Sequence, residues 1–426
     1  MAKTTGAVRP KSKRPPFIRL ALGLILLVGL VVYLSDATYY NRYGRLFYDF
    51  ATSQGQLERY DPVAPIAGAD QPFPVAAPQD KGVAPDAVAA ARAYAASNRS
   101  SAFLVWRDGA LIEQSYFGDR TRTDTVISRS LAKPWMSAAV GRAIQLGYFK
   151  SLDQPVADFI TEWKDDPKRS KILIRHLLDN RTGLLAQEPV FSPFEIRNRT
   201  YLHPYHERIL IEDYPILFEP GTRYDYSQAN GDYVAIIFER ASKRKYAEFL
   251  STELFKPMGA IGGTIWINRP DGVAHSGCCM QIPPEDFLRL GVLLMQDGVW
   301  NGVRLLPEGY VAEMVKGTAQ YPHAGLSVYI AGDYVKRRGF ANPDGSHTDT
   351  PTLHKEPYLA KDLFLFDGNM NQVVYVIPSA KLVILRTGRR PARQGPEWDN
   401  TILPNTILRG ITWKEGETRP EPQAAT

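Results

Sequence analysis

Strand patterns lie at the two ends of the main part of this chain. Four apolar runs of strand composition occur at Ala102–Val105, Leu111–Tyr116, Gln372–Val376 and Leu382–Arg386. Because short, uncrossed connections bring terminal strands together, this order predicts one antiparallel sheet built from both ends of the domain.

Helical patterns occupy the region between these strands. Apolar residues recur at helical spacing, and each pattern lies near a glycine or proline break. The predicted helices are Leu131–Leu146, Tyr233–Ala241, Tyr246–Phe255 and Pro284–Asp297. We therefore expect an α+β domain, in which an antiparallel sheet is flanked by helices and carries a helical subdomain.

Two further elements are predicted before the central helices. The stretch from Phe103 to Phe117 consists of two apolar runs about Asp108-Gly109, which predicts a hairpin with a tight turn. Ahead of it, Ala87–Ser97 is alanine-rich and helical, and Asp86 is the expected N-cap.

An unbroken apolar run, Leu20–Leu34, lies near the N-terminus, and Phe17-Ile18 extends it to the length that crosses a bilayer. Residues 1–16 are basic, which predicts a cytoplasmic tail, a membrane segment over 17–35 and an exported body. We expect a single-pass anchor in a bacterial inner membrane with the domain in the periplasm. Ser35-Asp36-Ala37 keeps the alternative of a cleaved signal peptide and a secreted protein open.

Residues 36–84 separate this segment from the predicted domain. Tyrosine and phenylalanine are dense between residues 39 and 50, as in the belts found at membrane interfaces. The proline-rich stretch that follows, residues 62–85, predicts a linker or an extended strap. The domain is expected over residues 85–411, and the polar, proline-containing residues 412–426 predict a loose tail.

Net charge does not point to a nucleic-acid partner. The formal charge of the chain is +6, from 51 Lys and Arg against 45 Asp and Glu. Six basic residues before position 20 account for the whole excess, so the body is electrically balanced. The two cysteines, Cys278 and Cys279, are adjacent, and we expect buried thiols and neither a disulfide nor a zinc site.

The segment Ser130-Leu131-Ala132-Lys133 carries the most informative chemistry of the chain. A lysine three residues after a serine lies on the same helix face, where a neutral amine could take the hydroxyl proton. Alternatively, Ser130 is only an N-cap and Lys133 reaches the surface. A second copy, Ser242-Lys243-Arg244-Lys245, lies in a charged stretch that predicts a solvated turn, so spacing alone does not decide between the two.

From about Ala87 to Gly388 the chain resembles the serine hydrolases related to class C β-lactamases and penicillin-binding proteins. Within them it is most similar to nylon-oligomer (6-aminohexanoate-dimer) hydrolases and related esterases. The resemblance is carried by Ser151–Phe159, Ile174–Leu178, Thr182-Gly183-Leu184, Glu219–Thr222, Tyr226–Asn230, Trp300–Leu306 and Val373–Pro378, in this order. In this resemblance Ser130-Lys133 is the functional pair, and Ser242-Lys245 is an exposed turn.

The resemblance implies a β-lactamase/DD-peptidase-like fold and acyl-enzyme chemistry on a small-molecule amide or ester, with no cofactor or metal. Ser130 would be the nucleophile, Lys133 its base, and Tyr226 the group that passes a proton to the leaving group. The oxyanion hole would use the N–H of Ser130 and one near Met370-Asn371. Further expected substrate-side residues are Gln228, Asn230, Asn369, Tyr201 and Tyr205.

Two departures from the family pattern keep other functions open. Gln228 stands where many relatives have asparagine, and the third motif appears as Gly368-Asn369-Met370-Asn371-Gln372, without a cation. Because that cation helps to hold a substrate carboxylate, its absence argues against β-lactams and D-Ala-D-Ala peptides. The alternatives are a D-amino-acid peptidase or carboxypeptidase acting on cell-wall peptides, and a catalytically silent binding module.

Other possible sites are weaker. Arg386-Thr387-Gly388 is similar to the missing third motif but follows the next strand, so we interpret it as structural. His203, His206 and Glu207 lack a zincin signature, and the tyrosine-rich segment around them is expected to border the substrate pocket. The sequence does not indicate an oligomeric state.

Overall fold

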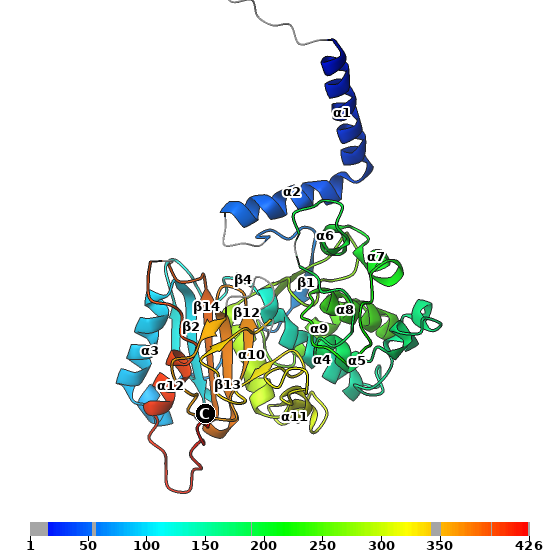
Figure 1. Cartoon of the computed structure of the whole chain (residues 1–426). Helices are drawn as coiled ribbons and strands as arrows, with labels where there is room; N and C mark the ends of the chain where they lie inside the picture. Colours follow the sequence, from blue (N-terminus) through cyan, green and yellow to red (C-terminus); the bar gives the residue numbers. More distant parts are fainter. Residues whose placement is uncertain (1–15, 53–56, 189, 342–350, 393, 425–426) are drawn as a thin grey trace, which may run out of the picture.

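A six-stranded antiparallel sheet, in the order β3-β2-β14-β13-β12-β9, forms the centre of the body (Figure 1). The computed structural model describes residues 16–52, 57–188, 190–341, 351–392 and 394–424. The strands are β2 (Ser100–Arg107), β3 (Ala110–Tyr116), β9 (Tyr329–Ile330), β12 (Phe364–Gly368), β13 (Gln372–Ile377) and β14 (Leu382–Gly388). Since β2 pairs with β14, strands from both ends of the domain meet in one sheet, as the sequence predicts.

The hairpin and the two-residue period are both visible in β2. Asp108 and Gly109 form its turn with positive φ values of 42° and 97°, which suit a tight hairpin. Along β2, Ala102 and Leu104 face the core shared with the helical subdomain, whereas the side chains between them face a second core on the opposite side. Both faces of the sheet are therefore covered.

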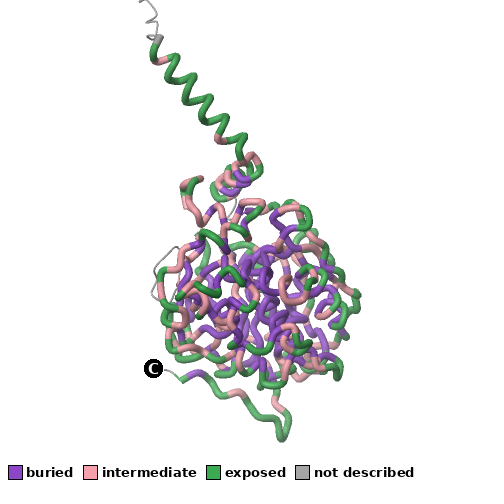
Figure 2. The backbone as a smooth tube through the Cα atoms, turned by 90° about the vertical axis from the view of Figure 1, so that its right-hand side faces the viewer, coloured by how far each residue is buried: buried purple, intermediate pink, exposed green. Residues whose placement is uncertain are grey.

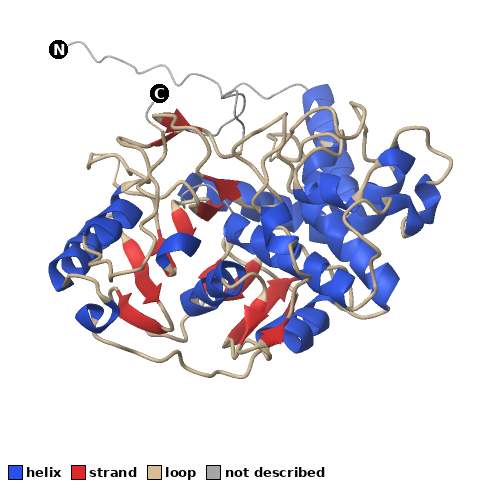
Figure 3. Cartoon of the chain, turned by 90° about the horizontal axis from the view of Figure 1, so that it is seen from below, coloured by secondary structure: helices blue, strands red, loops and turns tan. Residues whose placement is uncertain are grey.

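Helices cover the two faces of this sheet. On one face lie α3 (Pro85–Ser97) and α12 (Ile402–Arg409), which pack on each other, and on the other lies α10 (Pro284–Met295), which crosses β13 and β14. Figure 3 shows these layers and the helix-rich part beside them. The expected cap at Asp86 is wrong: Ala84 is the N-cap, Pro85 opens α3, and Asp86 lies in its first turn.

The helical subdomain contains most of the remaining helices. Pro134 lies at the start of α4, so the predicted helix from Leu131 begins as a short 3-10 turn, η2, and continues as α4. The predicted Tyr246–Phe255 helix is α9 followed by a π-helical turn. The elements are η2 (Arg129–Ala132), α4 (Lys133–Gln145), α5 (Ile174–Leu178), α6 (Ile196–Leu202), α7 (His206–Glu212), α8 (Ala229–Ser242), α9 (Tyr246–Leu250) and α11 (Tyr310–Met314).

The proline-rich segment is a strap rather than a free linker. Its residues Val63–Ala67 form β1, the edge strand of a second antiparallel sheet in the order β1-β5-β6-β4. The partners are β4 (Val126–Ile127), β5 (Gly262–Trp266) and β6 (Met280–Ile282). Pairs of short strands also occur, β7 (Val299–Trp300) with β8 (Val303–Arg304) and β10 (Arg337–Arg338) with β11 (Thr352–Leu353).

Two helices precede the strap. The exposed helix α1 (Pro16–Ser35) stands away from the body, and α2 (Ala37–Thr52) lies across the top of it (Figures 1 and 2). Within the described residues, Phe17–Ser35 is the one helix long and apolar enough to cross a membrane, and a signal sequence has the same properties. Most of the predicted basic tail, residues 1–15, lies outside the described residues.

The C-terminal segment is held more firmly than its composition predicts. Gln423 is buried, donates to the carbonyls of Ala331 and Gly332, and accepts from the N–H of Tyr358. Together with the contacts of Glu421 to Lys361, this buried amide holds a segment expected to be loose.

Candidate active site

Ser130 lies in η2, immediately before the buried helix α4 and beside the end of β12. The close approach of β12 depends on Gly368, because a Cβ there would lie 3.0 Å from Leu131 Cγ and 3.2 Å from its nitrogen. Glycine thus lets the edge of the central sheet contact the turn that carries Ser130.

The structure brings Ser130, Lys133 and Tyr226 together. Ser130 Oγ lies 2.5 Å from the hydroxyl of Tyr226, and Lys133 Nζ lies 3.4 Å from the same serine oxygen. The ammonium position is also 4.8 Å from the centre of the Tyr226 ring. Three side chains from two separate segments therefore meet at one oxygen atom.

Lys133 is buried, and its remaining contacts are acceptors. Nζ donates to Gln228 Oε1 at 2.7 Å and to the carbonyl of Gly277 at 2.9 Å. Burial lowers the pKa of Lys133 to about 7, although the charge of Asp232 opposes this shift. A neutral amine has two N–H donors and one lone pair. With both donors directed to Gln228 and Gly277, the lone pair is left for the Ser130 hydroxyl.

Two glycines make the contact with Gly277 possible. A Cβ on Gly231, in α8, would lie 2.5 Å from both the Cα and the nitrogen of Gly277. Such a distance is shorter than real contacts, so any larger residue would separate α8 from the segment that supplies the carbonyl.

A second buried cluster lies behind Lys133. Asp232 Oδ1 is 3.2 Å from His275 Nδ1, and Asp232 Oδ2 is 3.9 Å from His206 Nε2. All three side chains are fully buried. Burial raises the pKa of Asp232 to about 7, lowers that of His275 to about 3, and lowers that of His206 as well.

Among the residues that the structure describes, these three side chains are the group that could hold a metal ion, since their ligand atoms lie within 4.8 Å of one another. However, the imidazoles of His206 and His275 are stacked, with 4.2 Å between centroids and 19° between planes. Stacked rings direct their lone pairs side by side, whereas metal ligation needs lone pairs that converge on one point. We interpret the cluster as a carboxylate beside two neutral imidazoles.

A small pocket opens at Ser130, with a volume of about 290 Å³ including the part open to solvent. Its lining contains Ser130, Lys133 and Tyr226 together with residues that sequence reasoning missed. These are Asn180, Tyr224, Ala324, Gly325, Ser327, Val328, Tyr329 and Asp367. The sequence offered a neighbouring motif for Asn180, which precedes Thr182-Gly183-Leu184, for Tyr224, which precedes Tyr226–Asn230, and for Asp367, which directly precedes the Gly368–Gln372 motif. The other five come from segments without a recognised motif.

Gln228 and Asn230 support this pocket from behind. Gln228 Oε1 accepts a hydrogen bond from Lys133 Nζ. Asn230 is buried, donates to Asn180 Oδ1 at 3.0 Å and accepts from Thr182 Oγ1. Asn180 itself has a φ of +57°, so Asn230 holds a pocket residue in a left-handed conformation.

Five other predicted residues do not line the pocket. Tyr201 packs its ring edge-on against Trp266, and Tyr205 is exposed beneath the guanidinium of Arg269. Asn369, Met370 and Asn371 form the turn between β12 and β13, where the Met370 N–H donates to Asn369 Oδ1. The pocket residue from this part of the sheet is Asp367.

The second Ser-x-x-Lys copy has a different environment. Ser242 ends α8 and donates to the carbonyl of Phe238, and Lys245 is exposed and pairs with Glu239 at 3.1 Å. The predicted solvated turn is confirmed, and no hydroxyl–amine pair forms between these two side chains in the described structure.

Residues 86–387, more than half of the chain, match the family model named Beta-lactamase. The chain belongs to the β-lactamase family. It is 24% identical over 252 residues to the 6-aminohexanoate-dimer hydrolase of Paenarthrobacter ureafaciens. That match covers 56% of this chain and 63% of the relative, so the chain spans less than two thirds of the relative's length.

Solved structures of other proteins show the same fold. A Bacillus anthracis protein named provisionally as a 6-aminohexanoate-dimer hydrolase matches with a TM-score of 0.63 at 16% identity, over 85% of this chain and 92% of its own. EstCE1, described as a hydrolase with promiscuous acyltransferase activity, matches with a TM-score of 0.54 at 17% identity, over 77% and 97%. The predicted β-lactamase/DD-peptidase-like fold is therefore confirmed.

The third motif of this β-lactamase-family chain contains no cation on the pocket side. Arg386, which superficially fits that role, is fully buried in β14. It donates to the carbonyls of Met370 and Asn371 and to Ser100 Oγ. The structural interpretation of Arg386 is confirmed, because it fixes the β12–β13 turn from inside the sheet.

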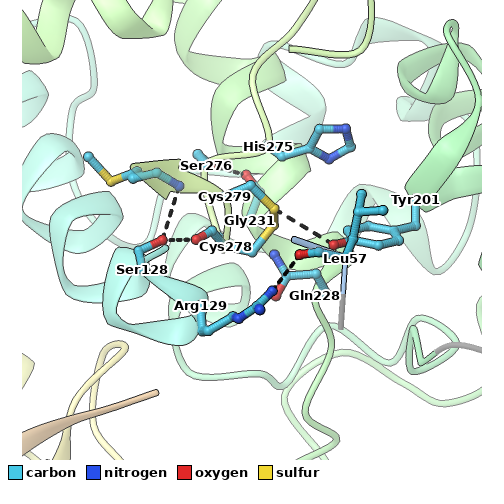
Figure 4. Close-up of a disulfide and its surroundings, with 12 residues drawn as sticks. Leu57, Ser128, Arg129, Tyr201, Gln228, Gly231, His275, Ser276, Cys278 and Cys279 are labelled. Carbon is cyan, nitrogen blue, oxygen red and sulfur yellow. Dashed lines mark hydrogen bonds between the residues drawn. A yellow bond between two sulfur atoms is a disulfide. The ribbon is translucent and has the colours of Figure 1, made fainter. Parts of the chain in front are cut away.

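The prediction for the cysteines was wrong, because Cys278 and Cys279 are joined by a disulfide between neighbouring residues (Figure 4). This bond lies directly after Gly277, whose carbonyl holds Lys133. Ser128 Oγ donates to the carbonyl of Cys278 and accepts from the N–H of Met280 at 3.0 Å. The adjacent spacing argued against a disulfide because structural disulfides rarely join neighbouring residues, whereas this one lies within a turn.

Arg129, next to Ser130, connects the site to residues 57–60, which lie between α2 and the strap. It has a φ of +51°, is buried, and donates to the carbonyl of Leu57 at 2.7 Å (Figure 4). Burial raises the pKa of Tyr60, and the neighbouring Arg129 guanidinium opposes this shift. Residues 57–60 thus support the residue that precedes Ser130.

Proposed function

We propose that this protein is a serine hydrolase that cleaves a small amide or ester through an acyl-enzyme intermediate. The observation that carries the proposal is the position of Lys133, whose Nζ lies 3.4 Å from Ser130 Oγ and whose other two hydrogen bonds are to acceptors, so that the neutral amine would direct its lone pair to the Ser130 hydroxyl. Membership in the β-lactamase family and similarity to an amide-cleaving relative support the same reaction type.

In the proposed reaction Ser130 Oγ attacks the substrate carbonyl while its proton moves to Lys133 Nζ. Tyr226, 2.5 Å from the serine oxygen, then passes a proton to the leaving amine or alcohol as the carbonyl–leaving-group bond breaks. Water attacks the resulting ester in a second step, gives up a proton to the same groups, and releases the acid with Ser130 restored.

For the developing oxyanion we propose the main-chain N–H of Ser130 and the N–H of Asp367, in place of one near Met370-Asn371. The carbonyl of Leu363 accepts from the N–H of Ala331, so the main-chain groups of Leu363 face the β9 side of the sheet edge. Main-chain groups alternate in direction along a strand, so those of Leu365 and Asp367 face the same side as those of Leu363. Asp367 also lines the pocket, which supports its N–H as an oxyanion donor.

The lining favours a substrate without a carboxylate near the reacting carbonyl. Lys133 is the only basic side chain among the lining residues that the structure describes, and Asp367 is acidic. A substrate carboxylate in this small pocket would lack a cationic partner, which the C-terminal carboxylate of a peptide substrate needs. For this reason an amide or ester hydrolase is a better proposal than a D-amino-acid carboxypeptidase. The contact between Gln228 and Lys133 argues against a silent binding module.

We also propose that α1 is retained as a membrane anchor, with the domain on the periplasmic side of a bacterial inner membrane. Apart from Arg19 and Ser35 the helix is apolar, none of Phe17–Ser35 is buried in the structure, and the residues before it are basic. A secreted protein with a cleaved signal is the alternative.

Intact-mass measurement after treatment with a fluorophosphonate tests the proposed nucleophile. The wild-type protein should gain one adduct, Ser130→Ala should gain none, and the matched control Ser242→Ala should behave as wild type. Absence of an adduct on folded wild-type protein, or its persistence in Ser130→Ala, would exclude this mechanism.

A further inference from the structure

The exposed aromatic rings of this protein gather in one region of its surface. Outside α1, every strongly exposed tyrosine, phenylalanine or tryptophan of the described residues lies in α2 or in segment 191–205. They are Tyr48, Phe50, Phe191, Phe194 and Tyr205. Phe191 is 87% and Phe194 is 72% exposed, values that are unusual for apolar rings and mark an interaction surface.

Helix α2 and segment 191–205 form one continuous surface. The hydroxyl of Tyr39 donates to the carbonyl of Pro193 at 2.6 Å, and the rings of Phe47 and Phe191 meet edge to face at 5.2 Å. Next to α1, His203 Nε2 lies 2.8 Å from Asp36, the residue between α1 and α2. The segment is therefore attached along α2, beginning at the end of the apolar helix.

The body also holds α2 firmly from below. Tyr39 and Leu46 are buried, and Arg42 donates to the carbonyls of Leu202, Asp61 and Asn268. As a result α2 cannot turn freely, and its orientation is that of the catalytic domain. Figure 1 shows α2 lying across the body, with α1 rising from its end at a steep angle.

We propose that α2 and segment 191–205 form a seat on the lipid bilayer, which holds the domain in one orientation against the membrane. This inference rests on the membrane anchor proposed above. When α1 spans the bilayer, α2 lies along its surface at the depth where aromatic rings are favoured. Exposed Arg45 and half-buried Arg199, whose guanidinium lies over the Tyr39 ring, add positive charge for lipid phosphates.

The test uses the full-length protein in nanodiscs with an environment-sensitive fluorophore on single introduced cysteines. Labelling is done without reductant, because Cys278 and Cys279 are joined. The test positions are Phe191→Cys and Phe194→Cys, and since both rings are exposed neither change empties a core position. The matched control is Ala424→Cys, exposed near the C-terminus, which lies far from α1 in Figures 1 and 2.

Headgroup-region spin-labelled lipid should quench the labels at 191 and 194 about twofold or more, and leave the label at 424 unquenched. Gly29→Cys, in α1 where an added Cβ meets nothing within 4 Å, reports insertion of the anchor itself. If lipid-chain spin labels quench the fluorophore at position 29 but those at 191 and 194 are not quenched, the membrane anchor is supported and the proposed bilayer contact is wrong. If none of these fluorophores is quenched, both proposals are wrong. Quenching at 424 equal to that at 191 would show a body without fixed orientation, and crosslinked dimers through 191 would show that a second copy covers the surface.

Discussion

Two segments of this chain have the same Ser-x-x-Lys spacing and opposite surroundings. In the first, Lys133 is buried between two acceptors and contacts Ser130, whereas in the second Lys245 is exposed and pairs with a glutamate. Burial lowers the pKa of Lys133 to about 7. The difference shows that the spacing supplies only proximity, and that the reactivity comes from what the rest of the fold places around the amine.

Replacement of the two lysines gives the largest contrast. Lys133→Ala should lower kcat/KM on an ester substrate on the order of 10³-fold, because the proton acceptor for Ser130 is lost. Lys245→Ala should leave kcat/KM unchanged, since it removes a partly exposed ion pair with Glu239, worth about 0–1 kcal/mol of unfolding free energy, and a hydrogen bond to the Asp271 carbonyl, neither of which involves Ser130.

Steady-state kinetics of both variants, with circular dichroism to confirm folding, make this measurement. Equal losses in the two variants, or full activity in Lys133→Ala, would contradict the assignment of Lys133 as the base.

The sequence predicted most elements of the fold because their signals are local. The hairpin about Asp108-Gly109, the helices around Lys133 and Tyr233, and the strands on either side of Lys381 all follow from periodicity and turn residues. The Asp86 cap failed because Pro85 already opens the helix and no side-chain cap forms.

The site was predicted less completely, for a physical reason. Ser130 and Lys133 are close in sequence, but Asp232, Gly277 and Asp367 reach them only through the tertiary fold. Tyr201 and Tyr205 were placed by the pocket from their position between motifs, yet α2 and residues 57–60 occupy that side of the body and Tyr201 packs there. A segment that resembled a free linker thus changed which residues border the site.

The close approach of α8 to Gly277 can be broken with one methyl group. Gly231→Ala would place a Cβ 2.5 Å from the Gly277 backbone, so the Gly277 carbonyl should move away from Lys133. We expect a loss of about 10- to 100-fold in kcat/KM and of about 1–3 kcal/mol in unfolding free energy.

Gly44→Ala is the matched control, because Gly44 is also helical and an added Cβ there meets nothing within 4 Å. Kinetics and denaturant unfolding of the two variants provide the comparison. Unchanged activity in Gly231→Ala would mean that the Gly277 carbonyl is not needed to orient Lys133.

The pH dependence of activity measures the surroundings of Lys133 directly. Since the proposed base must be neutral, kcat/KM should fall as the pH drops through about 7, the pKa of Lys133. The negative charge of Asp232 raises this pKa, so Asp232→Asn should move the acid limb of the profile to lower pH.

Asp286→Asn is the control for loss of a buried carboxylate. Asp286 is equally buried, and burial raises its pKa to about 7, but it accepts from the N–H groups of Ile261 and Gly262, and Asp232 is the charge that acts on the pKa of Lys133. The Asp286→Asn variant should lower the free energy of unfolding and leave the acid limb of the kcat/KM profile in place. An acid limb that stays in place in Asp232→Asn, or shifts equally in both variants, would rule out this coupling.

The disulfide should have the smallest effect, because it joins neighbours and closes almost no loop. Chain-entropy reasoning assigns such a short loop about 1 kcal/mol of unfolding free energy, below the 2–4 kcal/mol that is typical of disulfides. The double variant Cys278→Ser with Cys279→Ser should therefore unfold at slightly lower denaturant concentration and keep most of its kcat/KM, because Gly277 and Ser128 still hold the turn. Denaturant unfolding and ester kinetics on the same samples check both expectations. A loss of activity as large as that of Gly231→Ala would show that the covalent bond, rather than the glycine contact, positions the carbonyl that distinguishes Lys133 from Lys245.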